Sequence, residues 1–119
     1  MRKNDLRLRT KAFAVRTIKF VESLPRTRPA DVIGRQLLRS GVSVGSNYHA
    51  ACRAKSAADF IAKMAIVEEE ADECLYWMEL LTEAEVIRDR DSMTALMSEA
   101  DELVAIVVRS IQTARGRKR

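Results

Sequence analysis

The stretch from Ser40 to Leu81 constrains the fold of this 119-residue chain more than any other part. It contains the end of one apolar, periodic segment, a polar break near Lys55 and Ser56, and a second periodic segment. On both sides of the break, apolar residues recur at three- and four-residue spacing, which is the period of an amphipathic helix. Because the break is short, the two helices must run antiparallel. The stretch therefore predicts a helical hairpin against which the rest of the chain packs.

The same periodicity extends toward both ends of the chain. Proline removes a backbone donor and restricts the residue before it, so Pro25 to Pro29 separates the first helix from the second. Ser56 to Asp59 resembles a capping box at the start of the third helix. Only four glycines and two prolines are present, which leaves few turn residues for a sheet. We predict an all-α, antiparallel up-down-up-down four-helix bundle, a single domain over residues 1–119 with helices at about 5–24, 30–54, 57–84 and 90–114 and a basic tail at 115–119.

Two glycines interrupt the predicted second helix. Gly41 and Gly45 each cost a helix about 1 kcal/mol relative to alanine. Their four-residue spacing, with serines around them, predicts a flat strip that another helix approaches closely. A phosphate-binding loop is the alternative, but the segment has neither the Lys-Ser/Thr pair of a P-loop nor a preceding strand.

Charge is segregated along the chain. Residues 1–55 hold 13 Lys and Arg against 3 Asp and Glu, a net +10. Residues 56–105 hold 3 against 14, a net −11, and residues 106–119 carry +5. This pattern fits a polyanion site on the basic part, and it equally fits basic and acidic helices that pair within or between subunits.

The basic residues of the first two helices are the candidates for nucleic-acid contact. Aromatic residues make up only 5 % of the chain and are not interleaved with them, so a base-stacking platform is not predicted. Any contact is expected to reach phosphates with little sequence readout. The candidates are Arg2, Arg9, Arg16 and Lys19 on the first helix and Arg28, Arg35, Arg39 and Arg53 on or beside the second.

No catalytic or metal-binding pattern is present in the sequence. His49 is the only histidine, and no acidic residue precedes it by three, so the Glu-x-x-His pairs of a di-metal bundle are missing. We expect no catalytic residue, cofactor or metal. Asn47 on the inner face of the second helix and Glu68 beside the apolar stripe of the third are predicted to be structural polar groups.

Two further features concern location. No apolar run approaches the roughly 18 residues of a membrane span, and the charged N-terminus lacks the apolar core of a signal peptide. Cys52 and Cys74 are expected to lie roughly 24 Å apart along their helices, too far for a disulfide. We expect a cytoplasmic protein with no membrane contact.

Residues 36–81 resemble the four-helix-bundle family of bacterial 23S rRNA intervening-sequence proteins. The resemblance rests on the Ser-Val-small-small-Asn run, the Lys55-Ser56 turn, the Asp-Phe-Ile start and the glutamate-rich helix that follows. Much of the family has Asn-Ile-Ala-Glu-Gly where this chain has Asn47 to Ala51, so Ala50 replaces the glutamate. Glu68 still matches an acidic position of the third helix.

The resemblance implies a ring of bundles, usually a homopentamer, without enzymatic activity. The chain is also similar to the accessory variability protein of diversity-generating retroelements, which implies nucleic acid and a reverse transcriptase as partners. Our leading expectation is a non-enzymatic oligomer that binds an RNA or DNA backbone as an accessory factor. The alternative is a protein-interaction or structural oligomer whose basic and acidic surfaces pair between subunits.

Overall fold

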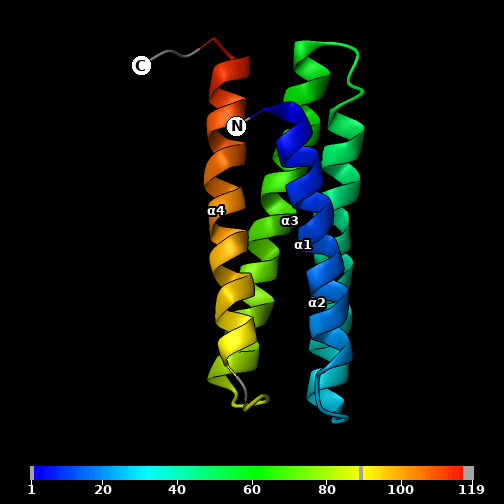
Figure 1. The fold of residues 1–119 in the computed structure, drawn as a ribbon, viewed down its shortest axis with the longest axis vertical. Coiled ribbons are helices and arrows are strands. Elements are labelled where there is room, and N and C mark those ends of the chain that lie inside the picture. The colour runs from blue at the N-terminus through cyan, green and yellow to red at the C-terminus, as the bar shows by residue number, and fades with distance from the viewer. Residues whose placement is uncertain (1, 89, 117–119) are drawn as a thin grey trace.

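The protein is a bundle of four α-helices, and the computed structural model describes residues 2–88 and 90–116. The helices are α1 (Lys3–Glu22), α2 (Arg28–Ala51), α3 (Ala57–Glu83) and α4 (Asp91–Ala114). The described residues contain no strand, so the predicted all-α class is confirmed. Consecutive helices run in opposite directions, so the start of α1 and the end of α4 lie at the same end of the bundle (Figure 1). Residues 117–119 of the predicted basic tail lie outside the described residues.

The helix boundaries differ from the predicted ones by up to three residues. The predicted second helix began after Pro29, whereas α2 begins at Arg28 and contains Pro29 in its first turn. A proline is tolerated there because the first-turn N–H groups have no intrahelical partner. Thr27 caps this helix, since its hydroxyl accepts a 3.3 Å hydrogen bond from the Ala30 amide. At the other end α2 stops at Ala51, three residues before the predicted end.

The predicted capping box at the start of α3 is confirmed with one variation. The Ser56 hydroxyl accepts a 3.0 Å hydrogen bond from the Asp59 amide. The Asp59 carboxylate in turn accepts a 3.2 Å bond from the amide of Lys55, one residue before the cap. Lys63 adds an ion pair of 2.5 Å to the same carboxylate. These bonds fix the turn between α2 and α3, which holds the central hairpin in place.

The core runs along the middle of the bundle and draws large side chains from every helix. Phe13, Leu37, Met64 and Leu103 are among its fully buried members, one from each helix. Burial of such a side chain contributes about 1.5–3 kcal/mol to stability. Every described buried side-chain nitrogen or oxygen has a hydrogen-bond partner.

The glycine strip of α2 lies against α1, as the sequence predicts. A Cβ atom added at Gly41 would lie 2.5–2.7 Å from three atoms of Thr17. One added at Gly45 would lie 3.3 Å from the carbonyl oxygen of Thr10. The two helices can therefore approach closely only because both positions lack a side chain.

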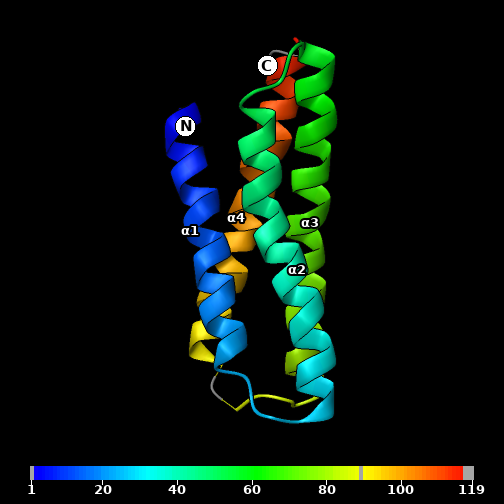
Figure 2. The ribbon, with the colours of Figure 1, turned by 90° about the vertical axis from the view of Figure 1, so that its right-hand side faces the viewer.

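The helices form a ring in which each contacts its neighbours in sequence, and α1 contacts α4 to close it. The α1–α4 contact is much the smallest of the four. Figure 2 shows why, because α1 and α4 cross rather than lie side by side along their length. Recesses remain on either side of the crossing, one near Leu6 and Ile106 and another near Phe20 and Leu96.

Candidate nucleic-acid interface

The exposed face of α2 carries a row of cations. Arg28, Arg35 and Arg39 are exposed, and their spacing places them within about 40° of one another around the helix axis. Val42 and Ser46 extend the same exposed face toward the end of α2. A row of this kind runs parallel to the helix axis and is accessible over most of its length.

A groove separates this face from α1. Ala14 and Gly45 form its floor, and because both are small the space above the α1–α2 contact stays open. Its volume is about 480 Å³. Arg7, Lys11 and His49 line the groove, and no carboxylate does. The remaining lining residues are Leu8, Val42 and Ser46.

A second recess of about 420 Å³ lies on the other side of Val42. It is lined by Arg35 and Arg39 together with Leu38, Val42, Ser43 and Ser46, and again by no carboxylate. The groove and this recess share Val42 and Ser46, so they form one continuous surface. We call this surface, with Arg28 at its lower end, the α1–α2 face.

Arg9 does not contribute to the α1–α2 face. It lies at the α1–α4 crossing, where its guanidinium donates to the two carboxylate oxygens of Glu99 at 2.6 and 2.8 Å. A third bond of 2.5 Å reaches Glu102. These hydrogen bonds raise the pKa of Arg9 further above its ordinary value. This charge of the predicted basic stripe is therefore neutralised within the chain.

Arg39 joins α2 to the acidic helix α3. It forms ion pairs with Glu70, at 3.3 Å, and with Glu73. The buried Ser40 hydroxyl donates a 2.7 Å hydrogen bond to Glu73, and the Trp77 indole donates another of 3.4 Å. The Ser40 bond, helped by Trp77 and Arg39, holds the pKa of the Glu73 carboxyl below its usual range. The sequence analysis did not identify this network. The feature that could have revealed it is a serine on α2 and an acid on α3, 33 residues apart, which face each other across the central hairpin.

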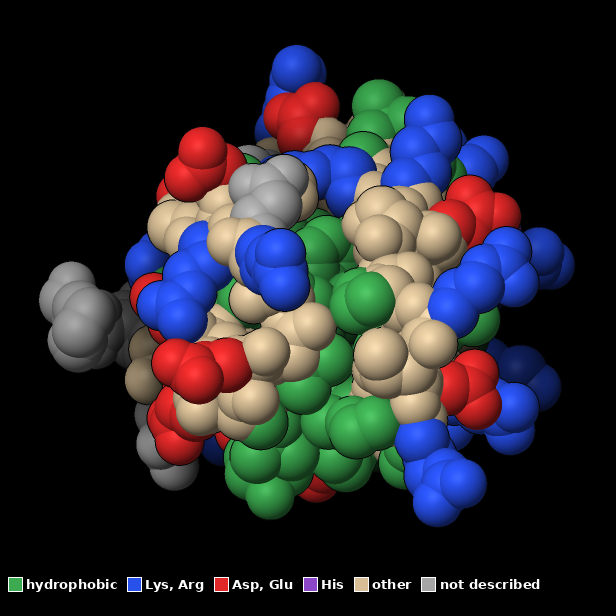
Figure 3. Space-filling model, turned by 90° about the horizontal axis from the view of Figure 1, so that it is seen from below, with side chains coloured by type: hydrophobic (Ala, Val, Ile, Leu, Met, Phe, Trp, Pro, Cys, Tyr) green, Lys and Arg blue, Asp and Glu red, His purple; other side chains and the backbone are tan. Residues whose placement is uncertain are grey.

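The other predicted cations are exposed and differ in their partners. Arg2 pairs with Asp5 at 3.5 Å, and Arg35 pairs with Asp31 at 3.0 Å within the same helix. Among the described residues, four predicted cations make no ion pair and no side-chain hydrogen bond: Arg16, Lys19, Arg28 and Arg53. Seen from the end that carries the α1–α2 and α3–α4 loops, Lys and Arg side chains project along the side of α1 and α2, with some acidic side chains between them (Figure 3).

The two predicted structural polar groups lie in different settings. Asn47 is half-buried, and its amide donates to the carbonyl and hydroxyl oxygens of Ser43 at 2.9 and 2.7 Å. This bond stays within α2. Glu68 is also half-buried but makes no hydrogen bond or ion pair with a described residue.

Arg7 and Lys11 are the residues of the α1–α2 face that sequence reasoning missed. The basic stripe through Arg2, Arg9 and Arg16 was the more obvious periodic pattern on α1, yet it borders α4. The strip of small residues around Gly45 is the sequence feature from which Arg7 and Lys11 could have been identified. Once α1 is docked on it, the α1 residues that flank the contact are Arg7 and Lys11.

The described residues also bear on metal binding, membrane insertion and thiol reactivity. Within residues 2–88 and 90–116, no group of three or more His, Cys, Asp or Glu is placed to hold a metal ion. No helix in those ranges is long and apolar enough to cross a membrane. Cys52 and Cys74 are both free thiols, and burial raises the pKa of Cys74 to about 12. A thiol with so high a pKa is a poor nucleophile.

Comparison with known proteins identifies the family. Residues 2–109 match the family model described as 23S rRNA-intervening sequence protein. The fold is similar to a crystal structure of a protein with unknown function from the S23 ribosomal protein family of Bacteroides thetaiotaomicron VPI-5482. The two share 33 % sequence identity and a TM-score of 0.85 over 94 % of this chain and 99 % of the other. No curated protein matches the sequence. On this evidence the chain belongs to the 23S rRNA-intervening sequence protein family.

Proposed function

We propose that this protein is a non-enzymatic, oligomeric bundle that binds the phosphate backbone of RNA or DNA through its α1–α2 face. It would act in the cytoplasm as an accessory factor, with a reverse transcriptase or another protein as a partner. The observation that carries the proposal is the groove between α1 and α2. Arg7, Lys11 and His49 line this groove, and no carboxylate of the described residues does.

The chemistry of the face favours a backbone over bases. Arg7 and Lys11 reach the groove from α1, and neither makes an ion pair with a described residue. Each phosphate contact releases condensed counterions, so a few such cations give measurable affinity at low salt. No Phe, Tyr or Trp lines the groove or the recess beside it, so neither offers the large aromatic platform on which bases stack. Binding of this kind is expected to discriminate little between sequences.

Arg35 and Arg39 are expected to contribute less than their number suggests. Both already face carboxylates, Asp31 and the Glu70–Glu73 pair respectively. A phosphate must therefore compete with an existing ion pair for each of them. Arg28, which has no such partner among the described residues, lies at the lower end of the face.

The test is the salt dependence of RNA affinity. A fluorescently labelled 16-base-pair RNA duplex is titrated with protein at 50, 100 and 200 mM KCl, and dissociation constants are read from anisotropy. We expect Arg7→Glu combined with Lys11→Glu to weaken binding at least tenfold at 50 mM and to lower the salt slope by about 2. Light scattering on the same samples reports the oligomeric state.

The matched control changes the same net charge on the α1–α4 side. Arg16→Glu combined with Lys19→Glu also removes two cations of α1 and adds two acids, but neither residue lines the groove. This variant is expected to bind RNA within about threefold of the wild type. Equal losses in the two double variants would show a response to net charge alone, and no binding by the wild type at 50 mM would refute the proposal.

A structural oligomer is the second candidate, and the exposed apolar side chains favour it. Leu8, Val32 and Tyr76 are each more than half exposed, on three different helices. Such residues are candidates for contacts between copies of the chain, for which the family resemblance implies a pentamer. Arg9 and Arg39 form ion pairs with acids of their own chain. Fewer charged groups therefore remain for pairing basic and acidic surfaces between subunits. An oligomer that persists at all three salt concentrations without binding RNA would favour this candidate.

A further inference from the structure

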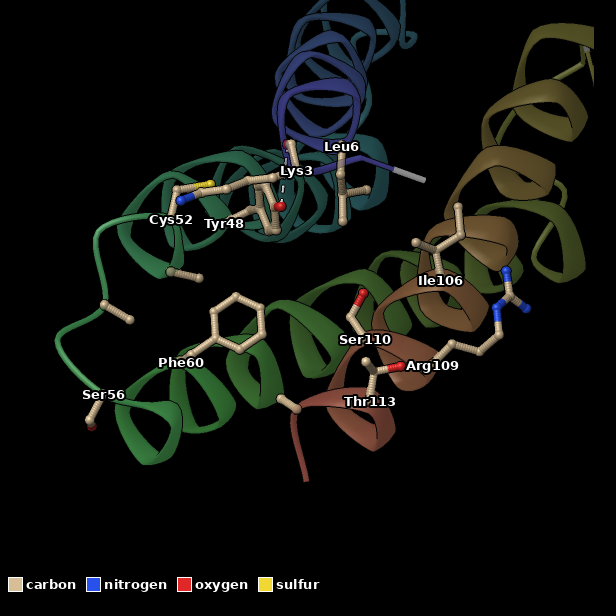
Figure 4. Close-up of a pocket in the computed structure, with 13 residues that line it drawn as sticks. Lys3, Leu6, Tyr48, Cys52, Ser56, Phe60, Ile106, Arg109, Ser110 and Thr113 are labelled. Atoms are coloured by element: carbon tan, nitrogen blue, oxygen red, sulfur yellow. Dashed lines mark hydrogen bonds between the residues drawn. The ribbon is translucent and has the colours of Figure 1, made fainter. Parts of the chain in front are cut away.

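A pocket opens at the end of the bundle that holds the chain termini and the α2–α3 turn. We call it the end pocket. Its volume is about 610 Å³, within the roughly 300–1,000 Å³ range of small-molecule sites. All four helices contribute to its walls, as Figure 4 shows.

The sequence explains why this end is hollow. The crossing of α1 and α4 separates them here, and three of the five α4 residues that line the space are small: Ser110, Thr113 and Ala114. The α2–α3 turn is also built of small residues at this point. The large side chains that line the pocket, such as Tyr48, Phe60 and Ile106, leave its centre open, whereas Phe13 fills its own layer of the core. The end pocket follows from the geometry of the helices and from small residues together.

The walls of the pocket are held in place. Leu6 and Tyr48 are 3 % exposed and belong to the core. The Tyr48 hydroxyl donates a 3.4 Å hydrogen bond to the carbonyl oxygen of Lys3, which ties α2 to the first turn of α1 (Figure 4). A preformed wall lowers the ordering cost of binding a ligand.

The polar groups of the pocket have one sign of charge. Among the described residues, Lys3 and Arg109 are the only charged ones that line the pocket. They come from opposite sides, α1 and α4, and their charged ends point apart (Figure 4). Neither makes an ion pair with a described residue, and no Asp or Glu lines the pocket. The remaining polar groups are hydroxyls and a thiol, which are neutral at physiological pH. The apolar part consists of Leu6, Phe60 and Ile106 with small alanines.

We propose that the end pocket binds a small amphipathic anion, an apolar body that carries a single carboxylate. The apolar body lies against Leu6, Phe60 and Ile106, and the carboxylate lies at the edge, where one of the two exposed cations, Lys3 or Arg109, can turn to meet it. A cationic ligand would meet two like charges and no carboxylate, and a neutral apolar ligand would gain no ion pair. This site is independent of the α1–α2 face, because the two surfaces share no residue.

The first experiment compares three probes that differ only in the head group. Octanoate, octan-1-ol and octylammonium are titrated into the protein by calorimetry at pH 7. An ion pair with an exposed cation is expected to make octanoate bind about two- to fivefold more tightly than octan-1-ol, and octylammonium more weakly than either. Equal affinity for octanoate and octylammonium would refute the anionic preference, and no binding of octanoate at millimolar concentration would refute the site.

Two variants locate the binding in the pocket. Ser110→Phe fills the space with a ring and is expected to lower octanoate affinity at least tenfold. Ser98→Phe adds the same ring on the exposed side of α4, where Ser98 lines none of the recesses described, and is expected to leave affinity unchanged. At least one of Lys3→Gln and Arg109→Gln is expected to weaken octanoate about two- to fivefold without affecting octan-1-ol. Unchanged octanoate binding by folded Ser110→Phe would place the ligand elsewhere.

Cys52 supplies a readout in the unmodified protein, which protects the test if Ser110→Phe fails to fold. Cys52 is half-buried and lines the pocket, whereas Cys74 is 0 % exposed. Octanoate is expected to slow alkylation of Cys52 by iodoacetamide at least threefold, while Cys74 stays unmodified throughout. Alkylation that is insensitive to octanoate would overturn the proposal. So would protection that rises with protein concentration in the absence of octanoate, because a second copy of the chain would then occupy the site.

Discussion

Gly41 is the residue at which the α1–α2 contact depends on a missing side chain. An alanine Cβ there would lie 2.5–2.7 Å from Thr17, and one of the atoms it meets is the Thr17 Cβ, which is fixed to the backbone. Gly41→Ala is therefore expected to lower the free energy of unfolding by about 1–3 kcal/mol, although alanine is the better helix former. Urea unfolding followed by circular dichroism measures this difference.

Gly34 provides the control for that substitution. A Cβ at Gly34 meets the end of the Leu24 side chain at 3.0 Å, which can turn away. Gly34→Ala is thus expected to change stability by less than about 1 kcal/mol. Equal destabilisation by both substitutions would mean that the close approach at Thr17 is not the cause.

The Ser40–Glu73 hydrogen bond makes stability depend on pH. Ser40 lowers the pKa of Glu73 below its ordinary value of 4.5. Because the carboxyl pKa is lower in the folded state, its contribution is complete above the unfolded-state pKa and is lost as pH falls through the folded-state pKa. Ser40→Ala is expected to cost about 1 kcal/mol at pH 7, with a difference from the wild type that shrinks below pH 4.5.

Urea midpoints at pH 7, 5, 4 and 3 measure this difference. Ser46→Ala is the control, since the Ser46 hydroxyl donates only a 3.4 Å bond to the Ser43 carbonyl and touches no acid. Its effect is expected to be small and the same at each pH. A constant gap between the wild type and Ser40→Ala from pH 7 to 3 would contradict the role assigned to Glu73.

At the scale of the elements, Arg9 joins two helices that otherwise contact each other little. Its side chain is 25 % exposed and that of Glu99 is 16 % exposed, so their two hydrogen bonds are partly shielded from water. A double-mutant cycle with Arg9→Ala and Glu99→Ala is expected to give a coupling energy of about 1–2 kcal/mol. The control is the Arg35–Asp31 pair, whose side chains are 77 % and 59 % exposed, and which should show almost no coupling.

The outcome of that cycle also bears on the sequence analysis. A coupling at Arg9 and Glu99 no larger than that of the control pair would mean that the α1–α4 ion pair adds nothing to the apolar contact. The basic stripe of α1, with Arg2, Arg9 and Arg16, would then again be a candidate surface for ligand binding. The cycle therefore separates a structural arginine from a binding arginine.

At the scale of the whole molecule, the fold was predictable and the orientation of its charged faces was not. The number and class of the helices follow from periodicity, and the approach at Gly41 and Gly45 follows from the missing side chains. Both are properties of single helices or of neighbouring ones. Whether the Arg9 stripe meets solvent or Glu99 depends on a contact between the first and the last helix, ninety residues apart in the chain. Helical spacing carries no information about that contact.

The same ring of contacts has a consequence for the order in which the chain folds. The three large interfaces each join helices that are adjacent in sequence, so they need only a short loop to close before they form. The crossing of α1 over α4 is the one interface that requires the whole chain to come together, and it is much the smallest. We therefore expect the hairpins to assemble first from local contacts and the α1–α4 contact to form late. On this argument we expect the bundle to fold fast, as proteins rich in local contacts do.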